Sequence, residues 1–84
     1  MNLLTKKGGA NMTNTAELER IIDESGFKKS YIAKAIGLKS TFGLSKKINN
    51  ETEFKASEIN KLCELLKIDT LERRHEIFFA KKVD

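Results

Sequence analysis

The sequence predicts an all-α domain, a compact bundle of about five short helices. Apolar side chains recur three and four residues apart in several segments, which is the spacing of one helix face. The 84 residues include no proline, and no segment shows the two-residue alternation of a strand. Apolar residues make up 39% of the chain and charged residues 33%, which suits a single small core. We expect one domain over residues 14–84, preceded by a leader over residues 1–13.

The leader is predicted to be flexible because it lacks periodicity and contains Gly8-Gly9. Codons that can encode Lys6 to Met12 include a purine-rich GGAGG shortly before the Met12 codon, where a bacterial ribosome-binding site would lie. Met12 is therefore a candidate natural start, with residues 1–11 translated from upstream of it. An ordinary N-terminal tail is the alternative.

Two of the expected helices are recognised by their caps and their apolar stripes. The first covers residues 15–25: Asn14 is a good N-cap and Glu17 follows three residues later, an arrangement known as a capping box. Gly26 supplies the left-handed stop. Another helix begins near Ala56. Its apolar stripe consists of Ile59, Leu62, Cys63 and Leu66.

Two further helices are predicted over residues 29–36 and 41–49, separated by a turn that contains Gly37. The backbone must leave the first of them sharply, and glycine does so most readily at positive φ. Leu44 and Ile48 lie four residues apart and hold the second helix against the core. A glycine-containing turn between two short helices, the second polar on its outer side, is a helix-turn-helix pattern.

The residues of this region resemble the Cro-like and lambda-repressor-like family of helix-turn-helix proteins. The resemblance rests on Ile32-Ala33, Ile36-Gly37-Leu38, Leu44-Ser45 and Ile48-Asn49. The later segments KINNETEFKASEINKLCELLKI and EIFFAKKV are similar to small single-domain phage regulators of Gram-positive bacteria, so the resemblance covers residues 15–83. It implies four or five helices, with the third helix reading operator DNA, usually as a dimer. This chain departs from the family's pattern in two ways. The interval from Gly37 to Leu44 is one residue longer than the commonest spacing in the family, and Gly43 lies inside the reading helix.

The outer side of the helix over residues 41–49 carries the predicted base contacts. On a helical projection they lie opposite or beside the apolar anchors: Thr41, Phe42, Ser45, Lys46 and Asn49. Asn can bond adenine bidentately, Lys can reach guanine O6 and N7, and an apolar group can cover a thymine methyl. Two alternatives stay open: Phe42 packs back onto the preceding helix, and Lys46 and Asn49 belong to an ordinary solvated face.

Phosphate contacts are expected around these bases. The candidates begin the helix over residues 29–36, occupy the turn, or end the reading helix: Lys28, Lys29, Ser30, Lys39, Ser40, Lys47 and Asn50. Free backbone N–H groups at a helix start also attract phosphate. Contacts of this kind give affinity and salt dependence but little sequence information.

A last helix is predicted to open at Asp69, with Glu72 completing a second capping box. It carries more large apolar side chains than the end of so small a domain needs. A dimer interface is therefore expected at Ile77, Phe78 and Phe79, placing two reading helices about 34 Å apart. The alternative is a helix whose apolar side chains all pack inside the domain.

Catalysis and cofactor binding find little support. His75, the only histidine, is expected to be half-buried, and Cys63, the only cysteine, lies in a core stripe. Zinc needs about four ligands, and no phosphate-binding glycine loop is evident. We expect no enzyme, no cofactor, no metal and no small-molecule substrate. A single cysteine and the absence of a signal peptide or membrane span favour a cytoplasmic protein in a bacterial cell.

The charge distribution favours a polyanionic partner. The chain's net charge is +4, and residues 28–67 alone carry +5. The sequence therefore predicts a dimeric, sequence-specific regulator of transcription, a phage repressor or Cro-type protein, that binds double-stranded operator DNA. An antitoxin-like regulator on the same scaffold fits the same residues. The rival from another class is a helical protein-interaction module anchored by Phe42 and the last helix.

Overall fold

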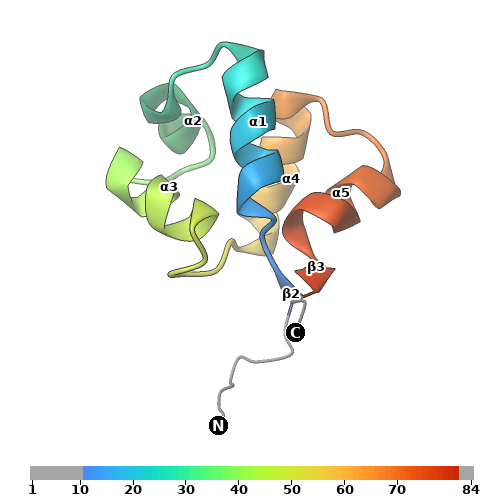
Figure 1. Ribbon diagram of the computed structural model, residues 1–84. Helices are drawn as coiled ribbons and strands as arrows, with labels where there is room; N and C mark the ends of the chain where they lie inside the picture. The colour runs from blue at the N-terminus through green and yellow to red at the C-terminus, as the bar shows by residue number, and fades with distance from the viewer. Residues whose placement is uncertain (1–10, 82–84) are drawn as a thin grey trace, which may run out of the picture.

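The structure of the protein, a computed structural model, describes residues 11–81 (Figure 1). Within that range there are five helices: α1 (Thr15–Ser25), α2 (Lys29–Ala35), α3 (Thr41–Ile48), α4 (Ala56–Leu66) and α5 (Leu71–Phe78). Two strands, β2 (Asn11–Met12) and β3 (Ala80–Lys81), form an antiparallel pair. The predicted all-α bundle is confirmed.

The strand pair moves the start of the folded domain toward the N-terminus. Asn11 pairs with Lys81 and Met12 with Ala80, and Thr13 is buried. Residues 11–13 therefore belong to the domain and not to the leader, where the sequence placed them. Strands of two residues are too short to show an alternating pattern, so they could not be predicted from the sequence. The remaining leader residues, 1–10, lie outside the described residues.

All five helices contribute to one core. The fully buried large side chains are Leu18, Ile32, Leu44, Ile48, Leu62 and Ile77. The α3–α4 loop adds Phe54, whose ring meets that of Phe78 edge to face at 5.6 Å. Leu66, expected in the α4 stripe, is only half-buried. The predicted burial of Cys63 is confirmed, and burial raises the pKa of its thiol.

The ends of α1 follow from its sequence, with one difference. The Asn14 side chain accepts a hydrogen bond from the backbone N–H of Glu17 at 3.2 Å, and Gly26 ends the helix at φ +79°. In a capping box the Glu17 side chain would also accept the backbone N–H of Asn14, but here that N–H has a partner outside the helix. The backbone N–H of Asn14 donates to the carbonyl oxygen of Ile77 at 2.7 Å, which ties α1 to α5.

The start of α5 differs from the prediction by one residue. Thr70, rather than Asp69, is the N-cap, and its hydroxyl accepts from the backbone N–H of Arg73 at 3.1 Å. Asp and Thr are both common N-caps, so two adjacent candidates leave the helix start ambiguous by one residue. Glu72 therefore lies in the first turn and forms no capping box with Asp69.

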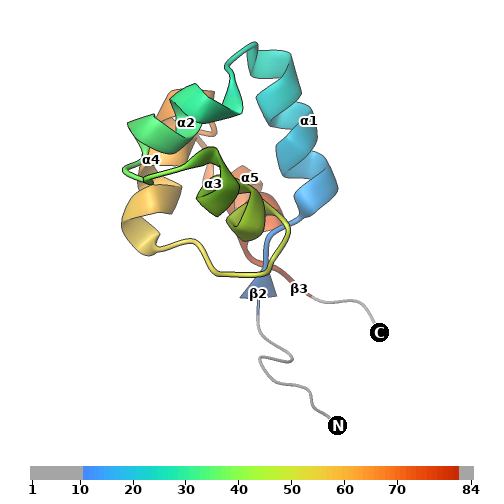
Figure 2. The same ribbon diagram turned by 90° about the vertical axis from the view of Figure 1, so that its left-hand side faces the viewer.

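The arrangement of the helices leaves α3 on the outside of the bundle. In Figure 1, α1 runs down the middle with α4 behind it, α2 and α3 lie on one side and α5 on the other. In Figure 2, the view onto that first side, α3 is in front and α5 behind it. Contacts made by the outer surface of α5 therefore leave α3 free.

Candidate nucleic-acid interface

The α2–α3 unit is built as the sequence predicts. Gly37, which follows the C-cap residue of α2, adopts φ +92°. The next residue, Leu38, donates its backbone N–H to the carbonyl oxygen of Ala33 at 2.8 Å. Leu44 and Ile48 are fully buried, so α3 is fixed to the core along one side. Rigid attachment of this kind lets the opposite side of a helix present side chains in a defined register.

Ser40 fixes where α3 begins. Its hydroxyl accepts a hydrogen bond from the backbone N–H of Gly43 at 3.0 Å, which makes it the N-cap. The helix therefore starts at Thr41, as predicted, and Gly43 occupies an ordinary helical position despite being glycine. The Ser40 hydroxyl accepts the Gly43 N–H, so a phosphate contact at this residue would use the hydroxyl as a donor while the cap bond is kept.

The outer side of α3 is accessible. Thr41, Phe42 and Asn49 are exposed, and Ser45 and Lys46 are half-buried. Phe42 is 72% exposed, so it does not pack back onto α2. Its ring instead lies under the ammonium group of Lys46, whose Nζ is 5.4 Å from the ring centroid. Four of the five predicted base-contact residues therefore lie at the surface of α3, and the fifth, Asn49, is its C-cap residue.

This region is basic without interruption. Residues 28–50, from before α2 to the end of α3, contain six lysines and no aspartate or glutamate. Lys29 pairs with Glu19 at 2.9 Å and Lys47 with Glu58 at 3.1 Å. Among residues 11–81, no acidic group pairs with the other four, Lys28, Lys34, Lys39 and Lys46. Lys34, exposed on α2, was not among the predicted contacts although it belongs to the same basic run.

Two predicted phosphate contacts have structural roles instead. Lys47 is largely buried; its Nζ pairs with Glu58 on α4 and donates to the carbonyl oxygen of Glu53 at 2.8 Å. The Glu58 carboxylate also accepts the backbone N–H of Lys55 at the start of α4. Lys47 thus holds α3 against α4, and its ammonium group already has two partners within the protein. Glu58 is a buried acidic residue on α4, where the sequence predicted only apolar side chains to be buried.

Asn50 holds the N-terminal segment against the end of α3. Its side chain accepts the N–H of Thr13 and donates to the carbonyl oxygen of Thr13, both at 2.9 Å. Beside it, the hydroxyl of Thr15 donates to the carbonyl oxygen of Ile48 at 2.6 Å, satisfying one of the last carbonyls of α3. Asn50 itself adopts φ +66°. Asn tolerates this left-handed conformation after a helix, and that tendency was the available sequence signal for its role.

The other predicted phosphate residues are more accessible. Lys28, Ser30 and Lys39 are exposed, and Lys29 is half-buried by its ion pair. Lys28 occupies the N-cap position of α2 without a side-chain cap bond. Lys28, Ser30 and Lys39 therefore keep their side chains directed to solvent around α2 and the turn.

The dimer residues predicted on α5 need correction. Ile77 is fully buried and Phe78 is 4% exposed, so both belong to the domain's own core, and Phe79 is half-buried. The exposed apolar group is Leu71, at 79%. His75 is exposed rather than half-buried, and its ring lies 5.5 Å from that of Phe79.

These α5 side chains surround a shallow depression, which we call the α5 surface. It is lined by Leu71, Glu72, His75, Glu76, Phe79 and Ala80. Of the three predicted dimer residues, only Phe79 borders this surface, because Ile77 and Phe78 are buried in the core.

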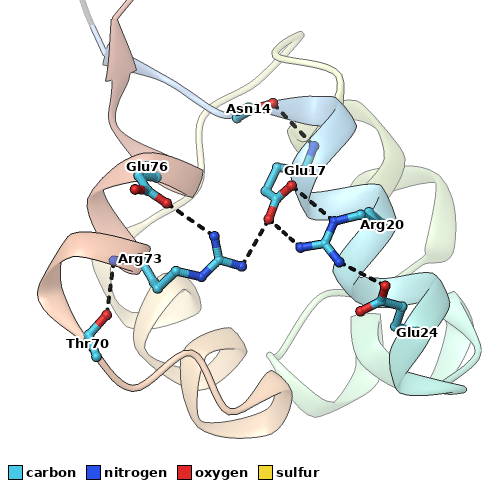
Figure 3. Close-up of polar contacts among 7 residues, drawn as sticks. All are labelled: Asn14, Glu17, Arg20, Glu24, Thr70, Arg73 and Glu76. Atoms are coloured by element: carbon cyan, nitrogen blue, oxygen red, sulfur yellow. Dashed lines mark hydrogen bonds and ion pairs between the residues drawn. The ribbon is translucent and has the colours of Figure 1, made fainter.

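An ion-pair network joins α1 to α5 (Figure 3). The Glu17 carboxylate accepts from Arg20 at 2.6 Å and from Arg73 at 2.9 Å. Arg20 also pairs with Glu24, and Arg73 with Glu76. The hydrogen bonds from Arg20 and then Arg73 lower the pKa of Glu17 to about 2.

Metal and membrane features are not found within the described part of the chain. Among residues 11–81, no group of three or more His, Cys, Asp or Glu side chains is placed to hold a metal ion. In the same range, no helix has the length and apolarity needed to cross a membrane.

The fold and surface define a small all-helical domain whose most basic region includes one exposed, firmly anchored helix. Comparison with protein-family models, curated proteins and solved structures gives no match for this chain.

Proposed function

We propose that the protein is a sequence-specific regulator of transcription that binds double-stranded DNA by placing α3 in the major groove. The observation that carries the proposal is the exposed outer side of α3, with Phe42, Lys46 and Asn49, on a helix fixed by Leu44 and Ile48. Eight helical residues extend about 12 Å, close to the width of the major groove. The matching charge comes from the four lysines of residues 28–50 that pair with no acidic group in the described part of the chain: Lys28, Lys34, Lys39 and Lys46.

Mechanistically, Lys28 and Lys39 bind phosphates and fix the position of the domain, while Lys46 and Asn49 bond base edges. Binding at an operator excludes RNA polymerase or a competing regulator from the same site. A second copy docks through the α5 surface, which replaces the buried residues first predicted for the dimer. Because α5 lies on the opposite side of the bundle from α3, this contact leaves the reading helix free. A two-fold pair built this way turns its two reading helices away from each other, so the spacing of about 34 Å first expected does not follow and each copy binds DNA separately.

The test is a fluorescence-anisotropy titration with duplexes selected from a random library and with DNA that flanks the protein's own gene. We expect tight binding to particular duplexes, weaker binding to scrambled ones, and affinity that falls as salt rises. Lys39→Ala should weaken binding to both kinds of DNA and flatten the salt dependence. Lys39 serves this purpose better than Lys29, whose ammonium already pairs with Glu19. Lys61→Ala, an equal charge change on α4, is the matched control and should have little effect.

The protein-interaction module remains the second candidate because Leu71 is 79% exposed at the α5 surface. Uniformly weak binding to all duplexes, unchanged by Lys39→Ala, would contradict the regulator and favour this module.

A further inference from the structure

Phe42 stands out among the aromatic residues of the domain. In residues 11–81 the other four phenylalanines each lie against an aromatic partner, in the pairs Phe27–Tyr31, Phe54–Phe78 and His75–Phe79. Phe42 belongs to none of these pairs: the Lys46 ammonium lies over its ring, and the side chain is 72% exposed. Its ring therefore adds little to the core, although leaving a phenylalanine in water forgoes a stabilisation of about 2 kcal/mol.

Phe42 and Lys46 act as one unit because they are four residues apart on α3 and share a side of the helix. The ring restricts where the ammonium can lie, since a cation is attracted to the face of an aromatic ring. An apolar ring edge and a cationic donor are thus presented together, with the nitrogen 5.4 Å from the ring centroid.

The major groove offers one apolar group on its base edges, the 5-methyl of thymine, which 5-methylcytosine also carries. Guanine offers O6 and N7 as acceptors for lysine. Successive bases are about 3.4 Å apart along a strand, so groups 5.4 Å apart are closer than two base steps. The ring and the ammonium therefore match neighbouring base pairs.

We propose that Phe42 and Lys46 together read a two-base-pair step in which a 5-methylpyrimidine lies next to a guanine. The ring of Phe42 covers the methyl group, and Lys46 donates to O6 or N7 of the guanine. This inference rests on the proposed function and names the element of the operator that this pair of side chains selects.

The experiment starts from duplexes that the full chain selects from a random library of double-stranded DNA. Thymines of a selected duplex are replaced one at a time by uracil, which removes only the methyl group. At one position beside a guanine, uracil should weaken binding about fourfold or more. With cytosine placed there instead, 5-methylcytosine should bind more tightly than cytosine by a similar factor.

Variants assign the two halves of the step. With Phe42→Ala, the thymine–uracil and 5-methylcytosine–cytosine differences should both disappear. Lys46→Ala should keep the methyl preference but lose the penalty for replacing the neighbouring guanine by 7-deazaguanine, which lacks N7. Lys39→Ala, the matched control, should weaken every duplex and leave both ratios unchanged. Circular dichroism checks that each variant is folded, which we expect because Phe42 and Lys46 lie outside the core.

The outcomes separate this inference from the proposed function. Selective binding without any methyl dependence at any thymine would overturn the inference and leave the regulator standing. A methyl effect that persists in Phe42→Ala would also overturn it, since another residue would then cover the methyl group. Failure to select any duplex would overturn both.

Discussion

Asn49 and Asn50 are adjacent at the end of α3, and only the Asn50 side chain is hydrogen-bonded within the described part of the protein. The Asn50 amide bonds both backbone groups of Thr13. Asn49 is exposed, and within residues 11–81 its side chain makes no hydrogen bond. The same substitution at these two adjacent positions therefore tests stability at Asn50 and DNA binding at Asn49.

Changing Asn50 to Ala should lower the free energy of unfolding by about 2 kcal/mol, from lost hydrogen bonds and the strain of alanine at positive φ. Urea denaturation measures this. Asn49→Ala, the matched control, should change stability by less than about 0.5 kcal/mol. On selected DNA the order should reverse, with Asn49→Ala weakening binding by about 1–3 kcal/mol at particular operator positions. Equal losses by Asn49→Ala on operator and scrambled DNA would contradict its role in base reading.

Gly43 is a residue that α3 does not need for its backbone. A Cβ built there would meet only the Ser40 hydroxyl, at an ordinary 3.5 Å. Gly43→Ala should therefore stabilise the domain by about 0.5–1 kcal/mol through helix propensity. Gly37→Ala should do the opposite, because Gly37 has φ +92°. Thermal melting of both variants tests the pair, and a destabilised Gly43→Ala would show that the space around α3 is tighter than described.

At the scale of elements, charged contacts decide how the helices are joined. The Glu17 network links α1 to α5, and the Lys47–Glu58 pair links α3 to α4. The two differ in burial: the side chains of Glu17, Arg73 and Arg20 are 24%, 40% and 50% exposed, whereas those of Lys47 and Glu58 are 13% and 8% exposed. We therefore test the Glu17 network by changing pH and the Lys47–Glu58 pair by substitution.

The Glu17 network should make stability depend on pH. The pKa of Glu17 is about 2 in the folded protein against an ordinary value of 4.5. Its contribution is therefore complete above about pH 4.5 and is lost as pH falls toward 2. The difference in melting temperature between the protein and Glu17→Gln should be largest near pH 6 and shrink over that interval. Glu24→Gln, which touches Arg20 alone, should show a smaller difference. A gap for Glu17→Gln that did not change with pH would contradict the assignment.

Removing Lys47 should leave the Glu58 carboxylate buried without its ion-pair partner. Lys47→Met should cost about 3 kcal/mol in urea denaturation. Adding Glu58→Gln should recover much of this loss, because the neutral amide can still accept the Lys55 N–H that caps α4. If the double variant were no more stable than Lys47→Met alone, the loss would come from packing rather than charge.

The contrast between elements and contacts explains how much the sequence could predict. The five helices follow from apolar spacing and caps, both local in sequence, and the anchors Leu44 and Ile48 follow from the same spacing. The internal bonds of Lys47 and Asn50 were not predicted because their partners lie on other parts of the fold: Lys47 pairs with Glu58 on α4, and Asn50 bonds Thr13, 37 residues earlier. A solvated lysine and a lysine that closes a helix junction look alike until the chain folds.

At the scale of the molecule, the helices α3 and α5 lie on opposite sides of the bundle. The sequence predicted an interface on α5 but could not say which side chains face inward, because Phe54 in a loop, rather than a helix, covers Phe78. The reassigned interface has Leu71 at its most exposed point.

Leu71→Glu should convert a dimer into a monomer at micromolar concentration, because a charge would be buried at the interface. Sedimentation equilibrium measures the mass directly. Tyr31→Glu, which changes an exposed residue on α2, is the control and should leave the dimer intact. An unchanged mass for Leu71→Glu, or a monomeric starting protein, would contradict the α5 interface.

The pairing of β2 with β3 has a consequence for engineering. Because Asn11 lies opposite Lys81 across an antiparallel ladder, the two backbones are only about 5 Å apart there. A short glycine bridge between them would close the polypeptide into a ring. Cutting that ring in the connection between α4 and α5 would move both new ends away from α3. Such a circular permutant would let a fluorophore or a fusion partner be attached far from the helix proposed to meet DNA.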